Sequence, residues 1–401
     1  MKFRIPHSIA FISYRSAALM AVLPLLLALP LNGCHANRAA SHASTASHIS
    51  STSLTSDEKE NCKRESGGRD DRFRRVPSYL PAQDGDICIT HRFMDDDKMS
   101  TLVARFEDSS KEPRWAINLT PQVADYGYTE SGSDAHSAQQ EARDLLISST
   151  AGYATISPNG KYVSLVLRPP ETTSEYHPHS QETPFTPGDQ RVTVVVLDAV
   201  SGKLVRTVEV SGLVLGQALT SDSLAVETAD TYYPAGAGKG RISVFSLTNT
   251  TSSPTSFNTS LWLAGSGKST LLLSSQPVHL HDSTTTSTVT QVDLHGKHLA
   301  SFTNSSEILL GGWIRSCTYL PDEDRIRWEI VDTNSRTVYD ETTEIASMHR
   351  VPTGSGLVMS EVVINDKGYR EAGAPHFWLS AADDGHRHTE NLEQFKVNSD
   401  T

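Results

Sequence analysis

Cysteine and cationic side chains are both scarce in this chain. It has 4 cysteines in 401 residues, and 35 Lys and Arg face 47 Asp and Glu, for a net charge of −12. An acidic surface repels phosphate backbones, so the composition argues against nucleic acid as a partner. None of the cysteine pairs has the spacing of a zinc site. The charge is equally typical of a soluble surface.

Recognisable catalytic motifs are also missing. The chain has no Gly-x-Ser-x-Gly elbow and no His-Glu-x-x-His motif. The run Gly265 to Thr270 imitates the end of a phosphate-binding loop, but Trp262 stands where the first glycine of that motif is needed. A strand-like segment follows instead of a helix, which predicts a turn and no bound nucleotide.

Histidine is frequent, yet it forms no convincing metal site. Three His-x-His pairs occur among 16 histidines, and residues two apart on a strand share a face. The pair His279 and His281, followed by Asp282, is the best of them. Pairs of this kind arise by chance in a histidine-rich chain, so we expect surface histidines and predict no metal and no cofactor.

Long apolar runs are absent except for one near the N-terminus. Residues 17–31 are wholly apolar, too short to cross a hydrocarbon core of ~30 Å comfortably, and a basic segment with Lys2 and Arg4 precedes them. The run ends in Leu31-Asn32-Gly33-Cys34, which resembles a bacterial lipobox. That resemblance implies a signal peptide over residues 1–33 and a lipid, such as palmitate, on Cys34. Asn32 departs from the family pattern, in which a smaller residue is usual. The alternatives are an ordinary signal peptide and a signal anchor.

Residues 34–80 lack apolar periodicity. A stretch rich in Ser, Thr, Ala and His is followed by a charged segment. Such a composition does not bury enough surface to offset chain entropy. We therefore predict a disordered tether between the lipid and a folded domain.

Residues 81–401 are predicted to form an all-β domain. Short runs rich in Val, Ile, Thr and aromatics alternate with turns of Gly, Asp, Asn, Ser or Pro. Strands end in turns near positions 108, 198, 245, 293, 332 and 381, with gaps of 90, 47, 48, 39 and 49 residues. A repeat of 40–50 residues is typical of a four-stranded propeller blade. We expect a β-propeller of six to eight four-stranded blades.

One turn carries a family resemblance. Leu197-Asp198-Ala199-Val200-Ser201-Gly202-Lys203 resembles the repeat core of quinoprotein-like (PQQ-like) propellers. In that family a tryptophan three residues after the lysine docks between blades, whereas this chain has Arg206 there and Ala300 at the equivalent place after Lys297. The resemblance implies a propeller of this type without its docking tryptophans, and it does not imply bound quinone.

The remaining cysteines leave two disulfides open. With Cys34 assigned to lipid, Cys62 and Cys88 are the closest pair in sequence, and Cys88 with Cys317 is the alternative. Either pairing leaves one thiol over.

Together these features predict an extracytoplasmic lipoprotein anchored in the cell membrane. Its propeller is expected to act as a binding or scaffold module for protein or glycan of the cell envelope. The alternative is an extracytoplasmic enzyme, a hydrolase or quinoprotein, with its site at the propeller channel. The absence of a recognisable catalytic constellation favours the binding module.

Overall fold

The computed structural model divides the chain into two compact units, Met1–Ala43 and Ser44–Thr401, and every described residue lies in the second. The residues that the structure describes are 49–64, 78–93, 99–107, 110–120, 154–167, 191–229, 240–275, 287–309, 311–322, 325–336, 338–340, 344–365, 368, 370–383 and 385–395. The predicted lipid acceptor Cys34 and the weak metal candidates His279, His281 and Asp282 fall outside them.

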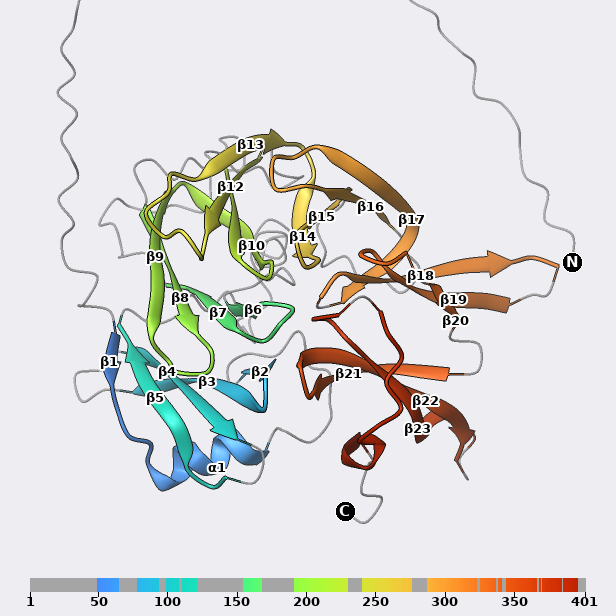
Figure 1. Ribbon diagram of the computed structural model, residues 1–401, viewed down its shortest axis with the longest axis horizontal. Helices are drawn as coiled ribbons and strands as arrows, with labels where there is room; N and C mark the ends of the chain where they lie inside the picture. The colour runs from blue at the N-terminus through green and yellow to red at the C-terminus, as the bar shows by residue number, and fades with distance from the viewer. Residues whose placement is uncertain are drawn as a thin grey trace, which may run out of the picture. The chain divides into compact units, whose positions relative to one another are not determined.

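The second unit is all-β, and its first three blades are meanders of antiparallel strands (Figure 1). Blade 1 contains β2 (Ser78–Ala82), β3 (Gly85–Phe93), β4 (Met99–Glu107) and β5 (Pro113–Leu119), with β1 (Ile49–Ser51) added beyond β5. Blade 2 contains β6 (Ala154–Ile156), β7 (Tyr162–Val166), β8 (Arg191–Asp198) and β9 (Leu204–Ser211). Blade 3 contains β10 (Leu213–Leu219), β11 (Ser223–Ala229), β12 (Gly240–Ser246) and β13 (Thr255–Thr259).

Blades 4 and 5 share a strand, and blade 6 is shorter. Blade 4 contains β14 (Trp262–Ser266), β15 (Leu271–Ser274), β16 (Ser287–Val292) and the first part of β17 (His298–Leu309). The end of β17 pairs with β18 (Trp313–Leu320), which continues into β19 (Arg325–Asp332) and β20 (Val338–Asp340) as blade 5. Blade 6 contains β21 (Glu344–Val351), β22 (Gly354–Ile364) and β23 (Arg370–Ser380).

Buried apolar clusters join the blades into a ring. The clusters pair blade 1 with 2, 2 with 3, 3 with 4, 4 with 5 and 5 with 6. Strand β8 illustrates the cause, because its residues Val194 to Leu197 are all buried, so both faces of the blade are covered by neighbours. The first strand of blade 1, β2, contacts β21 and β22 of blade 6 and completes the ring. In the described residues this is the packing of a propeller with six blades, within the range of six to eight that the sequence predicts.

The six turns predicted from sequence each follow the third strand of a blade. They come directly after β4, β8, β12, β16, β19 and β23. The gap of 90 residues between the first two does not mark an additional described blade, since its excess length falls in residues 121–153 and 168–190, which are not described.

Neighbouring blades are also joined by side chains that dock on these turns. Trp115 on β5 packs on Gly202, where a Cβ would lie 2.7 Å from the ring, and its indole N–H donates to the carbonyl of Ala199 at 3.2 Å. Phe257 on β13 packs on Gly296 in the same way. Both glycines have positive φ, 69° and 82°, which only glycine adopts without cost.

The expectation that docking tryptophans are missing is therefore wrong for blade 1. The family pattern places the tryptophan three residues after the lysine, whereas Trp115 lies four after Lys111. Arg206 takes the docking position on blade 2, where its guanidinium donates to the carbonyls of Ser246 at 2.6 Å and Ser252 at 3.0 Å. A cation with several donors thus replaces the indole.

Part of the predicted tether is folded. Residues 49–64, inside the range 34–80, form strand β1 and helix α1 (Ser56–Arg64), and β2 begins at Ser78, ahead of the predicted boundary at 81. The prediction of a tether without structure does not hold for these residues. Composition alone missed them because tertiary contacts, described below, hold them in place.

No helix among the described residues is long and apolar enough to cross a membrane.

Candidate functional site

The N-terminal strap, defined here as residues 49–64, is fastened along the outer edge of blade 1. It begins with β1, which pairs antiparallel with β5 through Ile49 to Leu119 and Ser51 to Ile117. Leu54 is 8% exposed and packs among Leu102, Ala104 and Ala116. One strand pairing and one apolar anchor therefore hold the first half of the strap.

Helix α1 begins with a capping box. Oγ1 of Thr55 accepts a bond from the Glu58 N–H at 3.2 Å, and Oε2 of Glu58 accepts one from the Thr55 N–H at 2.8 Å. This reciprocal pair satisfies two N–H groups at the helix start. The Thr-x-x-Glu signature is visible in the sequence and would have located the helix.

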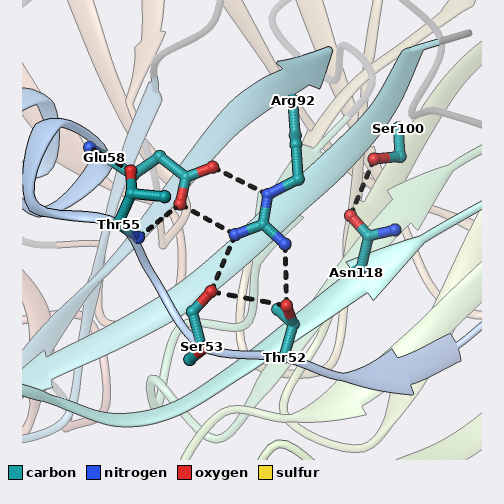
Figure 2. Close-up of polar contacts among 7 residues, drawn as sticks. All are labelled: Thr52, Ser53, Thr55, Glu58, Arg92, Ser100 and Asn118. Carbon is teal, nitrogen blue, oxygen red and sulfur yellow. Dashed lines mark hydrogen bonds and ion pairs between the residues drawn. The ribbon is translucent and has the colours of Figure 1, made fainter. Parts of the chain in front are cut away.

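Arg92 on β3 holds the strap through a charged hub (Figure 2). Its guanidinium donates to both carboxylate oxygens of Glu58, at 2.7 and 2.8 Å, to Oγ1 of Thr52 at 2.7 Å and to the Ser53 carbonyl at 2.8 Å. The hydrogen bond from Arg92 is the main cause of a lowered pKa of Glu58, and burial opposes it. The pair is bidentate and largely shielded, the geometry in which an ion pair contributes most.

A disulfide completes the strap. Cys62 on α1 is bonded to Cys88 on β3, with a Cα–Cα distance of 5.8 Å, and Cys317 is a free thiol. Of the two pairings left open by the sequence, the structure has the local one. Burial raises the pKa of the Cys317 thiol, which disfavours the reactive thiolate.

A surface groove of about 560 Å³ lies between the strap and β5. Residues 51–54 and 113–117 form its walls, and Ser201 and Gly202 of blade 2 also line it. Lys59 and Glu112, whose side chains are 2.6 Å apart, belong to the lining as well. The volume is in the range of small-ligand sites. The groove presents an indole, a serine-rich wall and one ion pair, with no arrangement of nucleophile and base.

The carboxyl of Glu227 is buried between blades 3 and 4. Glu227 on β11 is 2% exposed, and its Oε2 accepts a bond from the Leu263 N–H on β14 at 2.7 Å, joining blades 3 and 4. Desolvation raises the pKa of Glu227 to about 7. Gly240 faces this carboxyl, and a side chain there would collide with it.

The histidine pair His386 and His388 was read from sequence as surface turn, and the structure places it in a second fastening. The C-terminal clasp, defined here as residues 385–395, returns along β23. His388 stacks on Trp378 at 3.9 Å and contacts Asp383 at 2.6 Å and Glu390 at 2.8 Å. Burial lowers the pKa of His388, but the hydrogen bonds to Asp383 and Glu390 outweigh it, so the net shift is upward.

The segment that imitates a phosphate-binding loop contains a turn between two strands, as predicted. Gly265 and Ser266 end β14, and residues 267–270 form the turn to β15, closed by a bond from the Gly267 N–H to the Thr270 carbonyl at 2.9 Å. Among the described residues, no group of three or more His, Cys, Asp or Glu side chains is placed to hold a metal ion.

A comparison with known protein families finds no match, and a comparison with curated protein sequences finds none. A comparison with solved structures finds matches of low sequence identity and low TM-score. An acylaminoacyl peptidase from Pyrococcus horikoshii is 10% identical, with a TM-score of 0.42 over 77% of this chain and 44% of that one. The chain thus spans less than half the length of that peptidase.

Two further solved structures are covered by this chain over most of their own length. The β-propeller domain of the trilobed protease from Pyrococcus furiosus is 10% identical, with a TM-score of 0.37 over 75% of this chain and 85% of that one. BamB from Moraxella catarrhalis is 11% identical, with a TM-score of 0.33 over 84% of this chain and 97% of that one. The propeller assignment above stands on the strand order and the clusters between blades.

Proposed function

We propose that this chain is a lipid-anchored, extracytoplasmic membrane protein whose six-bladed propeller is a binding or scaffold module for protein or glycan of the cell envelope. The observation that carries the proposal is the strap, in which the segment following Cys34 is fastened to blade 1 by the Cys62–Cys88 disulfide. Structural disulfides form and persist in oxidising compartments, which supports a site of action outside the cytoplasm.

The strap also limits how far the ring reaches from its anchor. A tether over the full range 34–80 would give long reach, but β1 already begins at Ile49. About 15 residues separate Cys34 from Ile49, and a fully extended chain of that length spans at most ~50 Å. A lipid on Cys34 would therefore keep the start of β1 within that distance of the membrane.

Metabolic labelling with a palmitate analogue tests the anchor. We expect the full chain to incorporate label and to stay with the membrane fraction, and the Cys34→Ala variant to lose both. Cys317→Ala is the matched control, because it removes a thiol that is neither in the disulfide nor in the predicted lipobox. Equal labelling of the Cys34→Ala variant would end the lipoprotein proposal.

The state of the disulfide in the cell tests the compartment separately. Cells are lysed in denaturant that contains an alkylating reagent, and the chain is analysed by non-reducing electrophoresis. We expect the reagent to modify Cys317 and to leave Cys62 and Cys88 unmodified. Free thiols at both Cys62 and Cys88 would place the domain in a reducing compartment. Crosslinking in intact cells and recovery of the anchored chain then addresses whether the partner is protein or glycan.

A further inference from the structure

The described part of blade 6 has no fourth strand at its outer edge. Blades 1 to 5 each have at least four strands, whereas the described part of blade 6 has three, in the order β21, β22, β23. The strand at the N-terminal end of the unit, β1, pairs with β5 of blade 1 and does not complete blade 6. The outermost strand of blade 6 is therefore β23.

The C-terminal clasp occupies this position as a strand would, but over one residue pair. Trp378 and His388 exchange both backbone hydrogen bonds, at 2.9 and 3.0 Å, in an isolated antiparallel bridge. The same register would place His376 opposite Glu390 and Ser380 opposite His386, and the bridge does not extend to them. The backbone pairing of the clasp is thus much shorter than that of a blade strand.

Side chains add to this single pair. The rings of His388 and Trp378 are nearly parallel, 9° apart, and the Trp378 indole N–H donates to the Glu390 carbonyl at 2.8 Å. Leu392 and Phe395, on the short 3-10 helix η2 (Leu392–Phe395), pack on the cluster that contains Trp378. The edge therefore accepts an extended backbone, a flat ring on Trp378 and an apolar group beyond it.

The usable edge is bounded on one side. Pro375 has no N–H to offer, and the pairing of β22 with β23 shifts register around Ser360, opposite Pro375. Proline and bulges protect sheet edges against unspecific pairing. The remaining stretch, His376–Ser380, is long enough for a short strand. Asp383 follows it in the next turn, and its carboxylate accepts the ring N–H of His388.

We propose that the edge His376–Ser380 is a docking site for an extended segment of a partner protein, which replaces the C-terminal clasp as the fourth strand of blade 6. The partner segment carries a flat ring with a hydrogen-bond donor, to stack on Trp378 and to reach Asp383. This inference rests on the proposed binding function but not on the lipid anchor. Addition of a strand to an exposed sheet edge is a common mode of peptide recognition.

The clasp competes with such a partner. It is part of the same chain, so its effective concentration at the edge is in the millimolar range. A partner peptide should accordingly bind the full chain roughly hundredfold more weakly than a chain without the clasp.

A synthetic peptide with the sequence of residues 385–395 serves as the probe. The proteins are the purified full chain and the same chain ending at residue 384, whose fold is checked by circular dichroism and thermal unfolding. We expect the shortened chain to bind the peptide, by fluorescence anisotropy, and residues 376–380 to gain protection from hydrogen exchange. A folded shortened chain that binds no peptide would overturn the proposal.

Peptide variants test the partner chemistry. Replacing the histidine that corresponds to His388 by tyrosine keeps a ring with a donor, and replacing it by phenylalanine keeps only the ring. We expect the tyrosine peptide to bind the shortened chain, and we expect the phenylalanine peptide to bind it with about tenfold lower affinity. Equal affinity of the two peptides would contradict the proposal that a donor on the partner ring binds Asp383.

A second variant guards against failure of the shortened chain to fold. His388→Pro in the full chain removes the N–H that bonds to the Trp378 carbonyl and leaves Leu392 and Phe395 in place. It should bind the peptide more tightly than the wild-type chain does. A concentration-dependent dimer of the wild-type chain would instead assign the edge to the clasp of a second copy and refute the partner segment. Neither outcome depends on whether Cys34 is lipidated.

Discussion

The two ends of the described unit are fastened to the ring by opposite kinds of chemistry. The N-terminal strap lies on blade 1 and is held by a disulfide, a bidentate ion pair and strand pairing. The C-terminal clasp lies on blade 6 and is held by one backbone pair, a ring stack and two carboxylates on His388. The first includes a covalent bond, whereas the contacts of the second are all non-covalent.

This difference matters because the two ends flank the same junction. Among the described residues, each of the other five neighbouring blade pairs shares a buried apolar cluster, whereas blade 6 meets blade 1 through β2, β21 and β22. The disulfide-bonded fastening is at the N-terminal end of the unit. The non-covalent one covers the edge proposed for docking.

The largest effect is expected from Trp378, which anchors the clasp. It is 2% exposed, and replacing a buried tryptophan by alanine costs about 3–5 kcal/mol. Trp378→Ala should lower the free energy of unfolding by that amount in urea and should expose residues 385–395 to protease. Leu54→Ala is the matched variant on the strap, with a smaller loss of about 2 kcal/mol. Equal effects of the two would contradict the role given to Trp378.

Loss of the disulfide should come next. Cys62 and Cys88 are 26 residues apart, and closing a loop of that size contributes about 3.5 kcal/mol by limiting the unfolded chain. The double variant Cys62→Ala, Cys88→Ala should show that loss in urea unfolding, and protease should then cut near α1. Cys317→Ala is the control and should leave stability nearly unchanged. A strap that stays protected in the double variant would show that the ion pair and Leu54 suffice.

The ion pair of the strap should have a smaller, pH-dependent effect. Arg92→Met leaves Glu58 without its main partner, at a cost of about 2 kcal/mol at neutral pH. The folded-state pKa of Glu58 is lowered, so its contribution is present above the ordinary value of 4.5 and is lost as the pH falls through the folded pKa. The gap between wild type and variant should therefore close in acid. A gap that is constant from pH 7 to 3 would assign the loss to packing.

The smallest effect is expected at His388, and it has the opposite pH dependence to that of Glu58: its contribution to stability is lost as the pH rises. The folded-state pKa of His388 is raised above 6.5, so its contribution is present below that value and is lost as the pH rises through the folded pKa. His388→Gln should cost about 1 kcal/mol at pH 6 and less at pH 9, measured by urea unfolding. Clasp release, followed by hydrogen exchange of residues 376–380, should increase over the same range. An unchanged difference between pH 6 and 9 would separate the clasp from His388 ionisation.

Glu227 makes this comparison of variants necessary. Its raised pKa, about 7, means that the wild-type ring loses stability as the pH rises from about 4.5 to 7, since the unfolded chain releases this proton while the buried carboxyl keeps it. The difference between wild type and His388→Gln cancels that contribution because both proteins contain Glu227.

Much of the fold was predictable because it depends on local patterns. Turn residues between β-rich segments predict the six turns, and Gly202 and Gly296 in two of them have positive φ, 69° and 82°. The blade number was left at six to eight because the first gap, 90 residues, has the length of two repeats. Segment length alone does not distinguish a second blade from insertions.

The ends of the unit were not predictable in the same way. Residues 49–64 are polar and short of apolar periodicity, and they fold because Arg92 and Cys88, far along the chain, provide partners. His388 was recognised only as one of many histidines, since nothing in sequence places it against Trp378. Docking by Arg206 in place of a tryptophan was likewise outside the family pattern.

The sequence by itself determined the all-β class, the repeat of turns and the cysteines from which the disulfide was chosen, because strand periodicity and turn chemistry act between neighbours in the chain. Tertiary structure alone decided that the described residues form six blades, that a disulfide fastens the strap while non-covalent contacts hold the clasp, and that the described part of blade 6 has three strands. These depend on contacts between residues tens to hundreds of positions apart, and their energies come from burial and ion pairing that exist only after the ring has closed.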